Sequence, residues 1–168
     1  MPRIVDASTD HAPDVCRVCE RGWRDAYEDL LPAAYVEANV STWYRPERVR
    51  EEIADPAEWD PWRVALDGDR VVGAARGGLR DGGEAEVFNL YVDPDAQGAG
   101  VGSELLAGLT ERHRARGATA QVVESFAGNE SGLGFYRSKG FAEVDRHPAA
   151  AVAGVDPDHE AVRLRRDL

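Results

Sequence analysis

The sequence predicts one mixed α/β domain, residues 1–168, whose central sheet is mostly antiparallel. Its length fits a single domain, and 43% hydrophobic residues are enough for a core. Short Asp- and Gly-rich turns separate β-rich runs, a pattern typical of antiparallel hairpins. Segments with helical spacing of apolar residues precede and follow these runs. The predicted order is β-α-α-β-β-β-α-β-α-β-β.

The first third of the chain predicts one strand and two helices. Residues 3–7 have the character of a short strand, and apolar side chains recur at helical spacing from about residue 10 to residue 29. Pro32 ends this helix. A second helix is predicted at 46–54, because Pro46 suits a first helical position.

The rest of the chain predicts strands that alternate with helices. Two Asp-Pro pairs make residues 55–61 a loop. The predicted elements that follow are strands at 62–66, 70–77 and 85–92, a helix at 101–117, a strand at 119–124, a helix at 130–139, and strands at 141–145 and 160–168.

The charge of the chain excludes general nucleic-acid binding. The net charge is −11, with 31 Asp and Glu against 20 Lys and Arg, whereas phosphate neutralisation needs clustered basic residues. This acidity can steer cationic amines, but its even spread favours a general compositional bias. The start, Met-Pro-Arg-Ile-Val-Asp, lacks the apolar stretch of a secretory signal, and no apolar run has the length of a membrane span. We therefore expect a cytoplasmic protein.

Metal-ligating residues show no site pattern. Cys16 and Cys19 form a lone C-x-x-C without a second pair, and both fall on the apolar stripe of a predicted helix, where small buried hydrophobes are expected. The four histidines, His11, His113, His147 and His159, have no ligand spacing. No metal site is predicted.

A glycine-rich segment carries the strongest functional signal. Gln97-Gly98-Ala99-Gly100-Val101-Gly102-Ser103 follows a predicted strand and opens a predicted helix. Glycines let a ligand approach the backbone, and a helix N-terminus presents unpaired N–H groups, so the segment predicts a phosphate or pyrophosphate site. A P-loop is excluded because the only lysine, Lys139, lies far away. The spacing G-x-G-x-G also departs from the dinucleotide fingerprint, despite Glu124 at a suitable distance.

Residues 86–141 resemble the GNAT superfamily of acyl-CoA N-acyltransferases. The residues that carry the resemblance are Leu90-Tyr91-Val92, Gln97-Gly98-Ala99-Gly100-Val101-Gly102, Asn129, and Phe135-Tyr136-Arg137-Ser138-Lys139-Gly140-Phe141. Two motifs in this order, about 30 residues apart and on the expected elements, make a specific signal. A weaker resemblance, to members that act on small amines, covers residues 21–32.

The resemblance implies a GNAT-like fold, with a splayed sheet flanked by about four helices, that binds acetyl-CoA. Strand 86–92 is expected to diverge from strand 119–124, with pantetheine between them and the pyrophosphate on residues 98–103. The expected cofactor-binding residues are Leu90, Tyr91, Val92, Gln97, Gly98, Ala99, Gly100, Val101, Gly102, Ser103, Asn129 and Tyr136. Ala99 departs from the polar residue common at that loop position, and Gly132 and Gly134 lower the helix propensity before Tyr136.

The implied reaction is direct attack of a primary amine on acetyl-CoA in a ternary complex. The amine must lose a proton, and the candidate bases are Glu86, which leads, Glu84 and Glu124, or a water chain. Regular strand alternation puts Glu86 on one face with Phe88 and Leu90. Tyr136 is the candidate acid for the departing thiolate. Gly140 is expected to end its helix and Phe141 to fold back onto it.

The acceptor is expected to be a small-molecule amine, although a protein N-terminus also suits the scaffold. Its binding is expected from the N-terminal helices, where one or two of the aromatic residues could line a groove while the others form core. These aromatic residues are Trp23, Tyr27, Tyr35, Trp43, Tyr44 and Trp59. Rival functions are a non-catalytic acyl-CoA-binding regulatory module and a nicotinamide-dependent oxidoreductase. A homodimer is compatible with the sequence.

Overall fold

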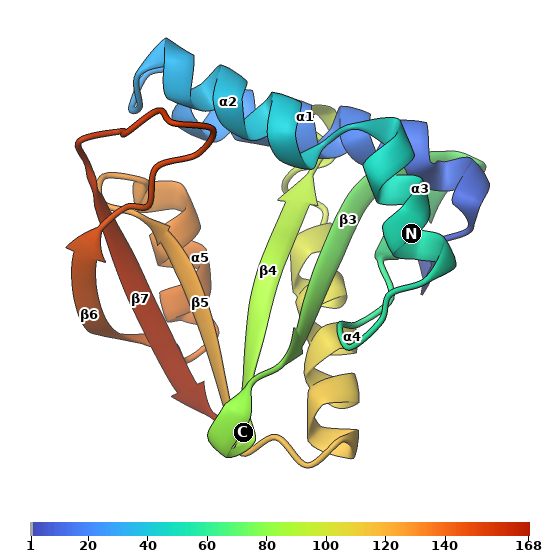
Figure 1. Ribbon diagram of the computed structural model, residues 1–168. Helices are drawn as coiled ribbons and strands as arrows, with labels where there is room; N and C mark the ends of the chain where they lie inside the picture. The colour runs from blue at the N-terminus through green and yellow to red at the C-terminus, as the bar shows by residue number, and fades with distance from the viewer. Residues whose placement is uncertain (1) are drawn as a thin grey trace.

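A seven-stranded sheet forms the centre of the computed structural model, which describes residues 2–168 (Figure 1). The strand order is β1-β2-β3-β4-β5-β7-β6, and every neighbouring pair is antiparallel except β4 with β5. The strands are β1 Arg3–Asp6, β2 Arg63–Asp67, β3 Arg70–Leu79, β4 Glu84–Val92, β5 Ala120–Phe126, β6 Ala142–Pro148 and β7 Glu160–Asp167. The predicted strands are therefore all present.

Five α-helices cover the two faces of the sheet. They are α1 Ala12–Tyr27, α2 Ala33–Trp43, α3 Pro46–Ala54, α4 Val101–Ala115 and α5 Glu130–Ser138. Side chains from α1, α2 and α3 form one core cluster, and side chains from α4 and α5 form a second. Within residues 2–168, no helix is long and apolar enough to cross a membrane.

Helix α2 is missing from the sequence prediction, which had only four helices. Its buried residues, Tyr35, Val36, Asn39 and Val40, have helical spacing, but the pattern includes a polar side chain. Asn39 is buried because its Nδ2 donates to the Tyr35 carbonyl oxygen over 2.9 Å. In the sequence, a polar residue such as Asn39 is expected at the surface. It therefore interrupts the apolar periodicity from which a helix is predicted.

The two central strands separate along their length, as the family resemblance implies. Only Glu84–Val87 of β4 pairs with Ala120–Val123 of β5. Beyond these residues β4 continues to pair with β3 and β5 with β7, so the two halves of the sheet diverge (Figure 1). Helix α1 runs across the open end. Gly22 allows its close approach, since a Cβ there would lie 2.9 Å from Cδ1 of Tyr91.

A β-bulge interrupts β4 within this divergent region. Arg76 of β3 pairs with Asn89, but Gly77 pairs with Val87, so that Phe88 is the extra residue. Leu90 consequently packs with Val87 in the second core cluster. The Phe88 ring instead meets Trp59 edge-on, with 5.0 Å between ring centroids. The expectation that Phe88 and Leu90 share one face is therefore wrong, because the bulge breaks the alternation.

Candidate active site

A cleft of about 830 Å³ occupies the space between the diverging strands. Five segments line it: the C-terminal end of α1 with the residues just after it, β4 from Val87 onward, the glycine loop with the start of α4, the C-terminal half of β5, and α5 with the residues just before it. The lining residues from these segments are Gly22, Asp25–Tyr27, Asp29–Leu30, Val87–Phe88, Leu90–Val92, Ala96–Gly98, Gly100–Ser103, Val123–Ser125, Gly128–Gly132 and Phe135–Tyr136. Every expected cofactor-binding residue except Ala99 lines this one cleft.

The glycine loop presents free backbone donors to the cleft. Gly98 and Gly100 have φ values of 85° and 81°, which other residues rarely adopt, and Gly100 is the N-cap of α4. The N–H groups of residues 98–103 have no hydrogen-bond partner within residues 2–168. A Cβ on Gly102 would lie 3.6 Å from the side chains of Val92 and Phe135, which both line the cleft. The loop thus has the geometry of an anion cradle.

Tyr136 is one of the residues that line the cleft. Its side chain is buried and stacks edge-on against Phe135 and Phe141, but the hydroxyl makes no hydrogen bond within residues 2–168. Burial, followed by the proximity of Tyr27, raises the pKa of Tyr136. Gly140 adopts a φ of 93° after α5, and the Phe141 N–H donates to the Tyr136 carbonyl oxygen. The expected helix end is confirmed, and the hydroxyl remains protonated at neutral pH.

Three polar side chains form a triangle beside Tyr136. The Asn129 Nδ2 donates to the Tyr27 hydroxyl over 3.1 Å and to the Ser125 hydroxyl over 3.0 Å, and the two hydroxyls are 3.3 Å apart. The Asn129 Oδ1 caps α5 by accepting from the Gly132 N–H. Of the two hydroxyl protons of Tyr27 and Ser125, only one is used in the hydrogen bond between these side chains. The other has no acceptor within residues 2–168, so it is available to a ligand in the cleft.

The three candidate bases occupy different environments. Glu86 does not line the cleft, and its Oε1 lies 3.1 Å from the Arg80 Nε. Glu84 lies 3.2 Å from an Arg163 guanidinium nitrogen and also does not line the cleft. Glu124 is the one of the three that does, because it lies just beyond the last residue of β5 that pairs with β4.

His147 and Arg163 hold the Glu124 carboxylate. The His147 Nε2 lies 2.9 Å from Oε1, and the Arg163 Nη1 lies 3.2 Å from Oε2. The hydrogen bond with the Pro148 carbonyl, followed by the hydrogen bond and charge of Glu124, raises the pKa of His147. A cleft carboxylate is thus paired with an ionisable group that is itself exposed to solvent.

The cleft lining is acidic. Asp25, Asp29, Glu124 and Glu130 line it, whereas no Lys or Arg of residues 2–168 does. Phosphate binding at the loop therefore depends on backbone N–H groups and the dipole of α4. Carboxylates at the α1 end favour a cationic molecule there.

The aromatic residues of the N-terminal helices are mostly core residues, and one of them also lines the cleft. Trp23, Tyr27, Tyr35 and Tyr44 are all buried core residues, and of these four Tyr27 also lines the cleft. Trp43 is 40% exposed and stacks with Arg48 instead.

The cysteines of α1 are both buried and free. Burial raises the pKa of Cys16 to about 12, with a smaller contribution from Glu47. Among residues 2–168 there is no cluster of three or more metal-ligating side chains.

A family model described as the acetyltransferase (GNAT) family matches residues 23–141. The chain belongs to the GNAT family. This match covers both central strands, the glycine loop and every residue that lines the cleft except Gly22, so the resemblance seen in the sequence is confirmed.

Relatives of known name are similar over part of the chain. The ribosomal protein bS18-alanine N-acetyltransferase of Escherichia coli strain K12 is 40% identical over 61 residues, which are 36% of this chain and 41% of the relative. The IAA acetyltransferase of Azospirillum brasilense is 35% identical over 77 residues, 46% of this chain and 48% of the relative. The chain thus spans less than half the length of these relatives.

A solved GNAT structure has the same fold over its full length. The PaiA N-acetyltransferase of Thermoplasma acidophilum, in complex with coenzyme A, has a TM-score of 0.82 at 16% identity, covering 100% of this chain and 99% of that one. The seven-stranded, splayed sheet is therefore the GNAT fold.

Two features of the cleft and its surroundings cannot be recognised in the sequence. The Tyr27–Ser125 contact joins residues 98 positions apart, and His147 had no recognisable spacing. The apolar periodicity of α1 predicts which face of the helix is buried. It does not predict that Tyr27, at the end of the helix, contacts Ser125 of β5.

Proposed function

We propose that this GNAT protein transfers an acetyl group from acetyl-CoA to a primary amine by direct attack within one cleft that holds both substrates. The observation that carries this proposal is the continuity of two features. A loop of unpaired backbone N–H groups leads into a cleft that contains the unbonded Tyr136 hydroxyl and the Glu124 carboxylate. The residues present therefore fit a long molecule with phosphates at one end and a reactive group at the other.

The phosphates of the cosubstrate are assigned to residues 98–103. Their N–H groups and the N-terminus of α4 supply donors and a positive dipole end. Pantetheine is assigned to the space along Leu90–Val92. Beyond Val87 this edge of β4 no longer pairs with β5, so its backbone groups are free to form hydrogen bonds with pantetheine. A backbone N–H from the same edge can stabilise the oxyanion that forms from the acyl carbonyl.

Glu124 is the proposed base. It lines the cleft where the strands diverge, and it pairs with His147, which can pass the accepted proton to solvent. Tyr136 is the proposed acid, because its burial keeps the hydroxyl protonated and no neighbouring residue uses that proton. The thiolate leaving group would accept it.

The proposed acceptor is a small molecule with a primary amine. Asp25 and Asp29 attract its ammonium group at the α1 end of the cleft. The free hydroxyl proton of the Tyr27–Ser125 pair offers one hydrogen bond to an oxygen of the acceptor. A protein N-terminus, which carries both an amine and a carbonyl oxygen, is the alternative acceptor, and the Escherichia coli relative is named for an alanine of a protein, ribosomal protein bS18.

Gly102→Ala tests the cradle, because it should affect folding and binding in opposite directions. The added Cβ makes only ordinary contacts at 3.6 Å, and Ala in place of Gly favours the helix by up to about 1 kcal/mol. The same Cβ projects into the cleft between Val92 and Phe135. We expect an unchanged or higher melting temperature, with coenzyme A affinity lowered by about tenfold or more in calorimetric titration.

Gly108→Ala is the matched control on the same helix. Its Cβ would meet only the flexible Arg63 side chain, at 3.4 Å, away from the cleft. We expect this variant to bind coenzyme A as the wild type does. If Gly102→Ala also binds it normally, the loop is not the phosphate site. A wild type that binds coenzyme A but acetylates no amine in a broad panel would indicate a regulatory module.

A further inference from the structure

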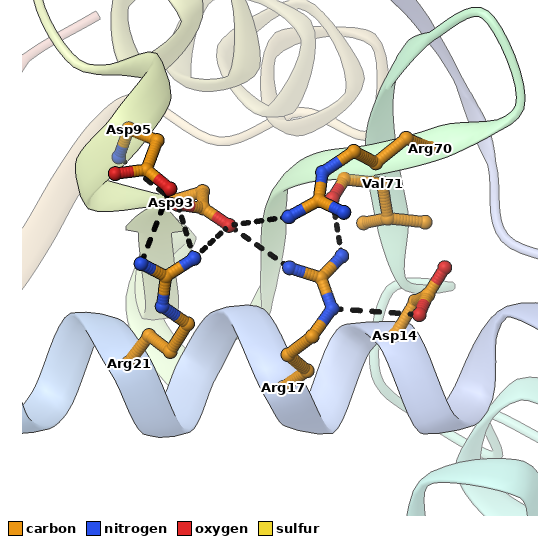
Figure 2. A network of polar contacts seen from close by, with 7 residues as sticks. All are labelled: Asp14, Arg17, Arg21, Arg70, Val71, Asp93 and Asp95. Atoms are coloured by element: carbon orange, nitrogen blue, oxygen red, sulfur yellow. Dashed lines mark hydrogen bonds and ion pairs between the residues drawn. The ribbon is translucent and has the colours of Figure 1, made fainter.

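An almost fully buried carboxylate lies where β4 passes into the glycine loop. The Asp93 side chain is 1% exposed and is surrounded by arginines (Figure 2). The Arg21 Nη1 lies 2.8 Å from Oδ1 and 2.9 Å from Oδ2, and the Arg17 Nη1 lies 2.9 Å from Oδ2. Arg70 approaches Oδ2 at 3.7 Å. Charge-assisted hydrogen bonds of this kind are about twice as strong as neutral ones.

The same residues join three elements to one another. Arg17 also donates to the Val71 carbonyl oxygen of β3 over 2.8 Å, and the Asp93 N–H donates to the Val72 carbonyl oxygen over 2.8 Å. Because Arg17 and Arg21 belong to α1, the start of the loop is fixed to both α1 and β3. Figure 2 shows the two arginines extending from successive turns of α1 to this one carboxylate.

Asp93 also organises the first turn of the loop. Its Oδ1 accepts from the Asp95 N–H over 3.0 Å, and its carbonyl oxygen accepts from the Ala96 N–H over 2.8 Å. Arg21 reaches the Asp95 carboxylate over 3.3 Å. From Gln97 to Gly100 the chain is exposed, and Val101 is again buried in the core. The loop is therefore held at two ends, and Asp93 forms the first.

We propose that Asp93, held by Arg17 and Arg21, is a positioning residue that presets the backbone N–H groups of residues 98–103 for the pyrophosphate of coenzyme A. The inference rests on the proposed cradle. Donors that are already arranged cost no ordering free energy when the ligand binds. A carboxylate that no ligand touches can in this way set the affinity for the phosphate end.

The ionised state that this role requires is favoured by the surroundings. Burial raises the pKa of Asp93, but the hydrogen bond from the Asp95 N–H and the charges of Arg21 and Arg17 outweigh it and hold the pKa below its ordinary value. The carboxylate is therefore ionised at neutral pH, and the network persists across the pH range of ordinary assays.

Asp93→Asn tests the proposal through the ratio of two affinities. Coenzyme A carries the pyrophosphate, whereas pantetheine lacks it, and both are titrated calorimetrically into the folded protein. We expect the Kd of coenzyme A to rise by about tenfold, equivalent to about 1.4 kcal/mol, and the Kd of pantetheine to change by less than about twofold. Loss of general stability alone would not change this ratio.

Two controls separate positioning from stability. Asp60→Asn alters another fully buried carboxylate, held by His113 and Arg116 at the far end of α4, and should lower the melting temperature without changing the ratio. Asp14→Asn removes an ion pair in which Oδ1 of Asp14 lies 3.5 Å from the Arg17 Nε. This ion pair does not involve the loop, so its loss should change neither the coenzyme A affinity nor the pantetheine affinity.

Arg21→Gln decides the question if Asp93→Asn does not fold. Arg21 is 39% exposed, so the fold tolerates its replacement more easily. The substitution still removes two hydrogen bonds to Asp93. We expect the same selective loss of coenzyme A affinity. The proposal is overturned if the folded variants bind coenzyme A as tightly as the wild type, or if both ligands weaken equally. A wild type that binds no coenzyme A would instead overturn the proposed function.

Discussion

Tyr136 combines a buried ring with a hydroxyl group that no other side chain uses. Removing that hydroxyl breaks no hydrogen bond, so Tyr136→Phe should fold with an unchanged melting temperature. Because general acid catalysis contributes about 100-fold or more, we expect kcat to fall by that factor while the KM for acetyl-CoA changes little. Steady-state kinetics with a thiol-detecting assay measures both. A variant with the wild-type kcat would contradict the role of acid.

Glu124 and Glu86 allow a direct comparison of two carboxylates on neighbouring strands. Glu124→Gln removes the carboxylate that lines the cleft, whereas Glu86→Gln alters one that faces Arg80 outside it. We expect kcat/KM to fall about 100-fold for the first and to stay near the wild-type value for the second. Initial rates over a range of pH measure this. The reverse result would identify Glu86 as the base.

Among the helices and strands, those that can be predicted from the sequence are those that depend on interactions between residues close together in the chain. The strands β2, β3 and β4 follow from alternation and Asp/Gly turns, and α4 follows from the helical spacing of Val101, Leu105 and Leu109. The bulge in β4 does not, because it depends on pairing with β3. A Cβ on Gly77 would collide with the Glu86 carbonyl oxygen, and no pattern within β4 itself reveals so close an approach.

The candidate site divides in the same way. The loop and the pair Asn129 and Tyr136 lie in short motifs, so the sequence could place them together. The bond between Arg21 and Asp93 spans 72 residues, and the choice between Glu86 and Glu124 depends on where two strands stop pairing. These features come from tertiary packing, which periodicity does not encode.

At the scale of the whole molecule, all five tyrosines share one electrostatic property. Burial is the largest cause that raises the pKa of each one, namely Tyr27, Tyr35, Tyr44, Tyr91 and Tyr136. An unfolded chain releases these protons near pH 10 and the folded chain does not. The unfolded state is therefore favoured increasingly above pH 10, by about 1.4 kcal/mol per pH unit for each tyrosine that stays protonated.

Alkaline titration monitored at the tyrosinate absorbance band measures this directly. We expect little ionisation of the native protein at about pH 10.5, where free phenols are mostly ionised, followed by a single cooperative rise when the protein unfolds. Far-ultraviolet circular dichroism should change over the same pH interval. Gradual ionisation of several tyrosines in a protein that remains folded would show that the aromatic core between α1, α2 and β5 is open to solvent.

The glycine loop is proposed to bind coenzyme A through its backbone N–H groups. An NMR titration of ¹⁵N-labelled protein with coenzyme A tests it most directly, because glycine amides occupy a distinct spectral region. We predict large shifts for Gly98, Gly100 and Gly102, and none for Gly117 and Gly154, which do not line the cleft. Saturable shifts elsewhere, with these three glycines unchanged, would show that coenzyme A binds at another site and that the loop does not hold its phosphates.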